Sequence, residues 1–262
     1  MSAPLGSHHG DVKHLRALLR DRGARDAAGL FACEGPRVIA AALDQEAPLQ
    51  EVFVGVDATF DAKAVAERAA EYYIPVRQLG PGVAARVSAT TTAQGVFALA
   101  PFRRSGVDAL AGASLVVVAP QIADPGNAGT LIRSAAAAGA EIIVLGPGSV
   151  DAYNPKTVRA TAGACFAVQI VEGVPAVKVL EALGSAGVHR VGALATGGSA
   201  PEAVDLTGPT AIVLGHEVHG LATDLPLDAR VSIPMRGTES LNVAMAGTLL
   251  LFEAARQRRA IA

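Results

Sequence analysis

Apolar positions along the chain follow two alternating spacings, that of an amphipathic helix and that of a short buried strand. Beyond residue 113, continuous apolar runs end at Gly, Pro or polar turns, over 115–119, 142–145, 188–194 and 211–214. Such runs are typical of strands buried on both faces. Helical periodicity fills the intervals, over 128–138, 176–186 and 240–258. The alternation predicts an α/β fold in which helices cover both faces of a mostly parallel sheet.

The first hundred residues show the same alternation in shorter elements. Strands are expected over 30–33, 52–54, 76–78 and 95–99, and helices over 11–22, from Pro36, and over 62–72. The stretch 101–113 begins with polar residues, contains Gly and lacks an apolar stripe, so we interpret it as a linker. We therefore predict two domains, residues 1–105 and residues 106–262.

Composition narrows the class of protein. The chain has 262 residues, of which 51% are hydrophobic and 18% charged, so it can bury a sizeable core and long disorder is excluded. The formal net charge of −2 provides no chain-wide basic field, so any nucleic-acid site must be local. Seven Phe, three Tyr and no Trp are too few for recognition mainly by base stacking.

Cysteine usage and the ends of the chain indicate a compartment. Cys33 and Cys165 lack the spacing of a zinc site or a disulfide framework, so we expect both to be reduced thiols. No signal peptide and no membrane-spanning stretch is recognisable. We expect a cytoplasmic protein with no membrane contact and no metal.

Ligands of open parallel sheets bind beyond the carboxyl ends of the strands, and three segments there carry polar residues. In the first, Asn127 follows a Pro-Gly turn and is expected to cap the next helix. Arg133 lies further along the same helix. From its position alone, a solubilising surface role and a role as a guanidinium aimed at a phosphate or an oxyanion are equally good interpretations.

The second segment, residues 214–221, runs from a strand into Gly, an acid and Gly again. It is either a tight strand-to-helix turn, with Glu217 favouring the helix dipole, or a loop that offers backbone groups to a ligand. By itself the segment favours the turn. His216 and His219 flank Glu217, but their spacing is not that of H-E-x-x-H, so a zinc site is not expected.

In the third segment, Pro234 and Gly237 predict an irregular loop before a long helix. Ser240 is expected to cap that helix, and Asn242 to face the loop from the first turn. Apolar positions of the helix form one stripe, Leu241, Met245, Thr248, Phe252 and Ala255. The stripe is either core or a dimer interface.

Together and in this order, the motifs N-x-G-x-x-x-R, L-G-x-E-x-x-G-L and I-P-M-x-G-x-x-S-L-N-V resemble the SpoU branch of the SPOUT class of S-adenosylmethionine-dependent RNA 2'-O-ribose methyltransferases. They span residues 127–243. Residues 12–20 and 31–35 resemble the small ribosomal-protein-like substrate domain of these enzymes. The resemblance covers nearly the whole chain. The two-domain form of the chain is similar to that of the ribosomal RNA enzymes of the thiostrepton-resistance type.

The resemblance implies a C-terminal domain with a trefoil knot, working as a homodimer. It implies that Gly215, Ile233 and Leu241 hold S-adenosylmethionine, with Thr196 as a weaker candidate. The polar positions that match the family's catalytic residues are Asn127, Arg133, Glu217, Ser240 and Asn242. One departure is Thr161, which stands where many relatives have Ser.

A methyl transfer to a ribose 2'-hydroxyl excludes DNA as a substrate, because DNA lacks that group. Some accounts of the family make the arginine at position 133 the general base. A guanidinium with a pKa above about 12 resists deprotonation. We favour Arg133 as a group that positions a phosphate and stabilises an oxyanion, with the proton passing to phosphate, water or a neighbour.

A local basic run at the start of the chain is a candidate RNA-docking surface. Its members are Lys13, Arg16, Arg20, Arg22 and Arg25, against the single acid Asp21. A solvated helix face explains such a run equally well.

Ribosomal RNA, of the 23S type, is the favoured substrate, and transfer RNA is the alternative because its enzymes share the motifs. A catalytically silent RNA-binding or ribosome-binding protein of the same fold is a rival hypothesis. An ordinary nucleotide-binding enzyme is disfavoured, since no GxGxxG or GxxxxGK[ST] follows a strand.

Overall fold

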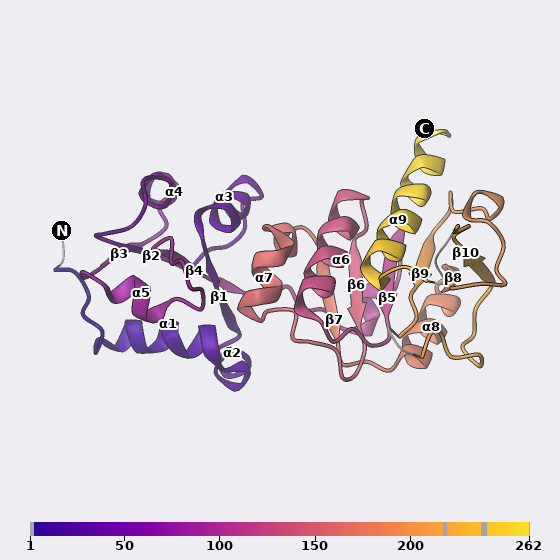
Figure 1. The fold of residues 1–262 in the computed structure, drawn as a ribbon, viewed down its shortest axis with the longest axis horizontal. Helices are drawn as coiled ribbons and strands as arrows, with labels where there is room; N and C mark the ends of the chain where they lie inside the picture. The colour runs from indigo at the N-terminus through magenta and orange to yellow at the C-terminus, as the bar shows by residue number, and fades with distance from the viewer. Residues whose placement is uncertain (1–2, 217–218, 237–239, 262) are drawn as a thin grey trace. The chain divides into compact units, whose positions relative to one another are not determined.

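The structure, a computed structural model, describes residues 3–216, 219–236 and 240–261 (Figure 1). The chain divides into two compact units. The N-terminal unit contains the residues up to Phe102 together with Tyr153–Phe166, and the C-terminal unit contains Arg103–Ala152 and the residues from Ala167. Residues 153–166, expected in the C-terminal domain, therefore belong to the N-terminal unit.

The N-terminal unit is built on a sheet of order β1-β4-β2-β3, in which β4 is antiparallel to β1 and β2, and β3 is parallel to β2. The strands are β1 (Leu30–Glu34), β2 (Glu51–Gly55), β3 (Val76–Leu79) and β4 (Val96–Pro101). The helices are α1 (Gly10–Arg20), α2 (Arg22–Ala28), α3 (Pro36–Asp44), α4 (Phe60–Glu71), α5 (Val83–Val87) and α7 (Pro155–Thr161). Burial of Leu15 and Leu18 of α1 against Phe53 and Phe97 of the sheet forms the core beneath α1.

The helix expected over 11–22 ends at Arg20 instead. Asp21 has an extended backbone and accepts a hydrogen bond from the amide of Gly23 at 2.9 Å, so it caps a second helix, α2. Asp is one of the residues that compete best for the N-cap position, which explains the interruption.

The segment 153–166 is held in the N-terminal unit by aromatic packing. The ring of Tyr153 lies 4.8 Å from that of Phe31 and 4.6 Å from that of Phe102, between centroids, and Phe166 lies 5.7 Å from Phe31. Where Gly163 turns with a φ of +94°, a Cβ atom would come within 2.3 Å of the Cβ of Ala41. Thr161 is buried and its hydroxyl donates to the carbonyl of Val158 at 2.7 Å, a role within the turn of α7.

The C-terminal unit contains a fully parallel sheet of order β10-β8-β9-β5-β6-β7, which confirms the predicted α/β class. Its strands are β5 (Leu115–Ala119), β6 (Ile142–Leu145), β7 (Gln169–Glu172), β8 (His189–Leu194), β9 (Thr210–Val213) and β10 (Ala229–Ser232). Its helices are α6 (Pro125–Ala137), α8 (Ala176–Ser185) and α9 (Val243–Arg259), and short 3-10 turns occur at η1 (Val107–Leu110) and η3 (Pro201–Ala203), with η2 (Ala164–Phe166) in the N-terminal unit. Val116 and Val118 face α8, and α6 packs against α9.

The edge strands β7 and β10 were not predicted from the sequence, because neither forms a continuous apolar run. Polar contacts hold β10 in place instead. The guanidinium of Arg190 in β8 donates to both carboxylate oxygens of Asp228, at 2.6 and 2.8 Å, and this hydrogen bonding lowers the pKa of Asp228 to about 2. The bidentate pair fixes the start of β10 beside β8.

Substituting Ala for Gly146 tests the packing at the end of β6. A Cβ atom there would lie 2.1 Å from the carbonyl oxygen of Pro120, a backbone atom that cannot move aside. Overpacking of this kind should lower the free energy of unfolding by about 1–3 kcal/mol in urea denaturation. Gly208, which has nothing within 4 Å of a Cβ position, is the control, and G208A should stay within about 0.5 kcal/mol. Equal stability of the two variants would contradict the packing.

Candidate functional site

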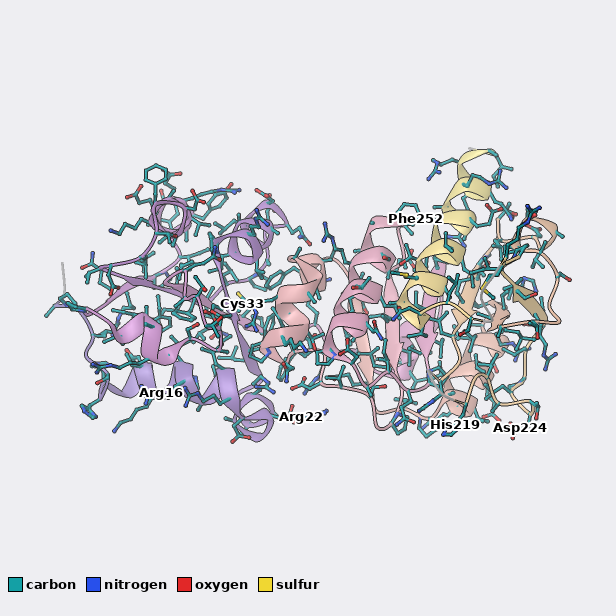
Figure 2. The ribbon with its side chains drawn as sticks, in the orientation of Figure 1. Arg16, Arg22, Cys33, His219, Asp224 and Phe252 are labelled. Carbon is teal, nitrogen blue, oxygen red and sulfur yellow. The ribbon has the colours of Figure 1, made fainter. Side chains whose placement is uncertain are left out.

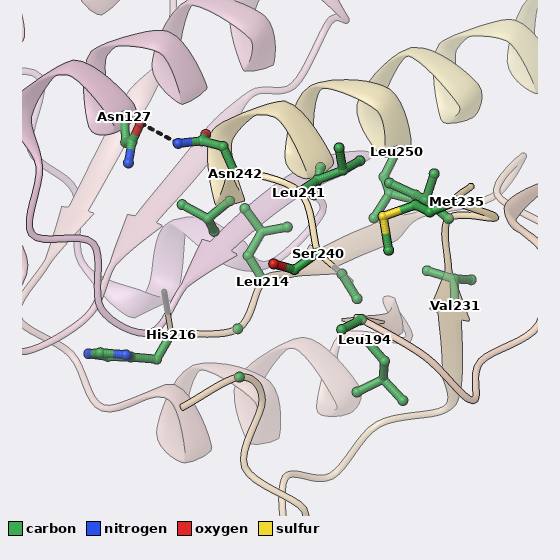
Figure 3. Close-up of a pocket in the computed structure, with 17 residues that line it drawn as sticks. Asn127, Leu194, Leu214, His216, Val231, Met235, Ser240, Leu241, Asn242 and Leu250 are labelled. Carbon is green, nitrogen blue, oxygen red and sulfur yellow. Dashed lines mark hydrogen bonds between the residues drawn. The ribbon is translucent and has the colours of Figure 1, made fainter. Parts of the chain in front are cut away.

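A cavity of about 550 Å³ opens beyond the carboxyl ends of β8, β9 and β10, which are neighbours in the sheet (Figure 3). Its walls come from residues 193–195 at the end of β8, 214–216 after β9, 231–235 at the end of β10 and beyond, and 240–250 across the start of α9. Because parallel strands end at the same edge of a sheet, loops far apart in the sequence meet there.

The lining differs from one end of the cavity to the other. Figure 3 shows Asn127, Asn242 and His216 at one end, and the side chains of Met235 and Leu250 at the opposite end. A ligand that fits this cavity would combine an apolar portion with a polar one.

Glycine is required where two turns of the backbone meet beside the cavity. His216 and Gly220 exchange backbone hydrogen bonds of 2.8 and 3.0 Å, which close the loop after β9. A Cβ on Gly215 would lie 2.7 Å from the carbonyl carbon of Gly220. A side chain at position 215 would therefore force the loop apart and change the cavity wall.

The helix starts next to the cavity differ from those expected. Asp124, not Asn127, caps α6, since its carboxylate accepts from the amide of Asn127 at 2.8 Å and Pro125 occupies the first turn. Asn242, not Ser240, caps α9 and accepts from the amides of Ala244 and Met245. Ser240 lines the cavity ahead of the helix.

Asn242 also joins the two helices. Its side-chain nitrogen donates to the side-chain oxygen of Asn127 at 3.0 Å, the dashed contact in Figure 3. Further along, the hydroxyls of Ser134 and Thr248 share a 2.7 Å hydrogen bond. Both contacts join α6 to α9, and the first of them lies in the cavity wall.

The structure brings together six of the predicted site residues in the cavity lining, Asn127, Gly215, Ile233, Ser240, Leu241 and Asn242. Thr196 is exposed and is not among the described residues that line it. Glu217 lies outside the described residues. Arg133 is exposed on α6, away from the lining, and no described residue forms a hydrogen bond or ion pair with it.

Several lining residues were not predicted, among them Leu194, His216 and Met235. Their signal was available in part, because Leu194 ends a predicted strand and residues at that edge of the sheet were expected to meet a ligand. The Nδ1 atom of His216 accepts a hydrogen bond of 3.3 Å from the backbone amide of His219. The two imidazole rings stack with their centroids 4.8 Å apart. Among the described residues, no group of three or more His, Cys, Asp or Glu is placed to hold a metal ion.

The predicted RNA-docking surface is only partly exposed. Lys13, Arg20 and Arg22 are exposed and Arg16 is half-buried. Figure 2 labels Arg16 on α1 and Arg22 at the start of α2. Arg25 was expected beside them, but it is only 3% exposed and its Nη1 donates to the carbonyl of Leu18 at 2.8 Å. Its guanidinium therefore stabilises the α1–α2 corner and does not face a partner.

The remaining sequence expectations concern the cysteines and membrane spans. Cys33 and Cys165 are buried free thiols, and burial raises the pKa of Cys33, which keeps it in the unreactive protonated form. Within the described part of the chain, no helix combines the length and apolar character needed to cross a membrane.

Comparison with known proteins places these features in a family. Residues 114–252 match the SpoU rRNA Methylase family, and residues 10–98 match the MRM3-like substrate binding domain. The chain is 34% identical over 149 residues to an uncharacterized tRNA/rRNA methyltransferase of Mycolicibacterium smegmatis. The matched segment covers 56% of this chain and 48% of that protein. The chain thus spans about half the length of this curated relative.

Two further relatives cover different shares. The 23S rRNA (guanosine-2'-O-)-methyltransferase RlmB of Xanthomonas axonopodis pv. citri is 33% identical over 155 residues, 58% of this chain and 62% of that one. The crystal structure of an AdoMet-bound rRNA methyltransferase from Sinorhizobium meliloti superposes with a TM-score of 0.83 at 28% identity, covering 97% of each chain.

Two substitutions of Asn242 separate its two contacts. Asn242→Asp keeps the oxygen that caps α9 and loses the nitrogen that bonds Asn127, so stability should stay near that of the unchanged protein. Asn242→Ala loses both and should lower the free energy of unfolding by about 1 kcal/mol in urea titrations. If both variants lost the same stability, the cap would not be the stabilising contact.

Proposed function

The chain belongs to the SpoU rRNA methylase family, and on that premise we propose that it transfers the methyl group of S-adenosylmethionine to a ribose 2'-hydroxyl of RNA. The observation that carries the proposal is the cavity at the carboxyl edge of the parallel sheet. There Gly215 of the second motif and Ile233 and Leu241 of the third line one cavity, with Asn127 of the first motif at its polar end.

The cavity suits S-adenosylmethionine in size and character. Its volume of about 550 Å³ is within the range of about 300–1,000 Å³ for small-molecule sites. Leu194, Met235 and Leu250 offer an apolar surface to a ring system, and the loops at Gly215 and Leu241 bring backbone groups to the wall. When bound, the cofactor supplies an electrophilic methyl group on a sulfonium. The crystallised Sinorhizobium meliloti relative is described as AdoMet-bound, which supports the assignment.

The chain's own polar residues then serve the acceptor ribose. Asn127, held by Asn242, borders the polar end of the cavity, where the 2'-hydroxyl has to approach. Arg133 is exposed, and no described residue forms a hydrogen bond or ion pair with it, so its guanidinium is available to RNA. We assign Arg133 to an RNA phosphate and to the developing oxyanion. Roles for Ser240 and Glu217 remain part of the proposal, as does the trefoil knot.

Ribosomal RNA is the proposed substrate, because the RlmB relative is named for 23S rRNA and residues 10–98 match a substrate-binding domain. Transfer RNA is the second candidate, since the Mycolicibacterium relative is named for either RNA. We place the reaction in the cytoplasm. Incubation with total RNA and tritiated S-adenosylmethionine, followed by mapping of the labelled 2'-O-methyl group, tests the proposal. Cofactor binding without labelling of any RNA would contradict it.

A homodimer through α9 is proposed from its exposed apolar face. The expected single stripe is not found: Ala255 is buried and Thr248 bonds Ser134, whereas Met245 and Phe252 are 61% and 44% exposed. Figure 2 labels Phe252 on α9. Leu249 is exposed between them. Exposed apolar side chains at spacings of four and three residues form one face of a helix, which suits a second copy of the chain.

Arg133→Lys tests the role of the guanidinium fork. Lys keeps the charge but cannot make two parallel hydrogen bonds, so we expect kcat to fall by roughly tenfold or more if the fork stabilises the transition state. Cofactor affinity, measured by calorimetry, should not change, because Arg133 lies outside the cavity lining. Full activity of Arg133→Lys would show that charge alone suffices.

Met245→Glu with Phe252→Glu tests the dimer. Two charges on the exposed face should shift the protein from dimer to monomer in sedimentation equilibrium, because a charge buried without a partner is costly. Val177→Glu, at a residue of α8 that is 44% exposed, is the control and should leave the mass unchanged. A monomeric unchanged protein would refute the interface.

A further inference from the structure

Arg159 of α7 has a guanidinium with a fixed position and unused donors. Its Nη1 lies 3.8 Å from the Oε2 of Glu34, and its side chain is 30% exposed. No described residue accepts a hydrogen bond from any of its N–H groups, and Nη1 itself is buried without such a partner. If the role of Arg159 were only structural, we would expect its N–H groups to donate hydrogen bonds to nearby acceptors.

Glu34 explains why the guanidinium is held there. This carboxylate at the end of β1 is 4% exposed and accepts hydrogen bonds from the hydroxyls of Ser88 and Thr90 and from the amide of Ala89. The loop that starts at Ser88 therefore supplies three hydrogen bonds to this carboxylate, while its buried charge is stabilised by a cation nearby. Arg159 supplies the cation by proximity alone, so the attraction fixes its position and leaves its donors available.

The surroundings of Arg159 favour an anion. Lys156 is exposed three residues earlier on α7, which places it one turn away on the same side of the helix. Thr91 and Thr92 follow Thr90 with exposed side chains, and Thr90 is bonded to the carboxylate that Arg159 faces. Arg159 and Lys156 thus offer positive charge along one side of α7, and the planar fork of Arg fits a phosphate group.

We propose that Arg159 binds a phosphate of the RNA backbone, with Glu34 as the residue that positions it. The inference rests on the proposed function, since it names a second RNA contact of the same enzyme. The contact lies in the segment 153–166. This segment follows β6 in the sequence but belongs to the N-terminal unit. The competing interpretation is that Arg159 only neutralises Glu34.

Substitution of Arg159 separates the two interpretations. The dissociation constant for purified 23S ribosomal RNA and for bulk transfer RNA would be measured by filter binding across a salt series. Arg159→Ala should weaken binding of the RNA that is the substrate by about tenfold, the effect of one charge-assisted hydrogen bond. The slope of log affinity against log salt should fall by about 0.7–0.9, the value of one phosphate contact.

Arg68→Ala is the matched control. Arg68 lies in the same unit, its side chain is 35% exposed, and it pairs with Asp44 at 2.6 Å, so its removal costs the unit the same charge. RNA affinity and salt slope should stay unchanged. If Arg159→Ala weakened binding no more than Arg68→Ala, the phosphate contact would be refuted.

Loss of the cation beside buried Glu34 could unfold Arg159→Ala, so Arg159→Lys provides a second test. It keeps a charge beside Glu34 and should bind S-adenosylmethionine normally, yet bind RNA several-fold more weakly because the fork is lost. RNA affinity equal to that of the unchanged protein would refute the fork.

A double-mutant cycle tests the positioning role of Glu34. Glu34→Gln should weaken RNA binding in the unchanged background and have little further effect once Arg159 is Ala. Additive effects, or a loss of thermal stability with unchanged RNA affinity, would show that Glu34 is only structural. Failure of the unchanged protein to methylate any RNA would instead refute the proposed function, so the two failures are distinct.

Discussion

The side chain of Asn242 has one oxygen and one nitrogen, and each is committed to a different helix. The oxygen closes the first turn of α9, and the nitrogen donates to Asn127 in α6. Because the cap fixes the orientation of the amide, the nitrogen can only point toward α6. The polar end of the cavity therefore depends on a residue whose first task is to start a helix. The same constraint relates two motifs that are more than a hundred residues apart in the sequence.

A second constraint operates in the N-terminal unit. The aromatic cluster of Phe31, Phe102, Tyr153 and Phe166 holds a segment between β6 and β7 in the N-terminal unit. The close approach at Gly163 and the buried Glu34 give this segment a defined position within the unit. The chain thus places residues from the middle of the sequence in the same unit as α1. Sequence order alone would assign them to the C-terminal unit.

The fold was predictable where burial was strongest. Strands β5, β6 and β9 are buried on both faces, so their apolar runs were visible, whereas the edge strands β7 and β10 had no such run. The cap at Asp124 was misassigned although Pro125 marked it, because Asn127 is an equally good capping residue. Whether Ser240 or Asn242 caps α9 depends on the hydrogen bond between Asn242 and Asn127. This tertiary contact cannot be inferred from local spacing. Burial of Arg25 also depends on a tertiary contact, its hydrogen bond to the carbonyl of Leu18, whereas a basic residue in a basic run was expected to face water.

The position of Arg133 limits what it can do. Six residues separate it from Asn127 on α6, which is about 9 Å along the helix and about 120° around it. Asn127 lines the cavity, so Arg133 projects from another side of the helix and is not among the described lining residues. Its guanidinium can still meet an RNA strand whose ribose enters at the polar end, because neighbouring phosphates extend beyond that ribose. This geometry supports the proposal that Arg133 acts on the nucleic acid and that the loops at Gly215, Ile233 and Leu241, which line the cavity, bind the cofactor.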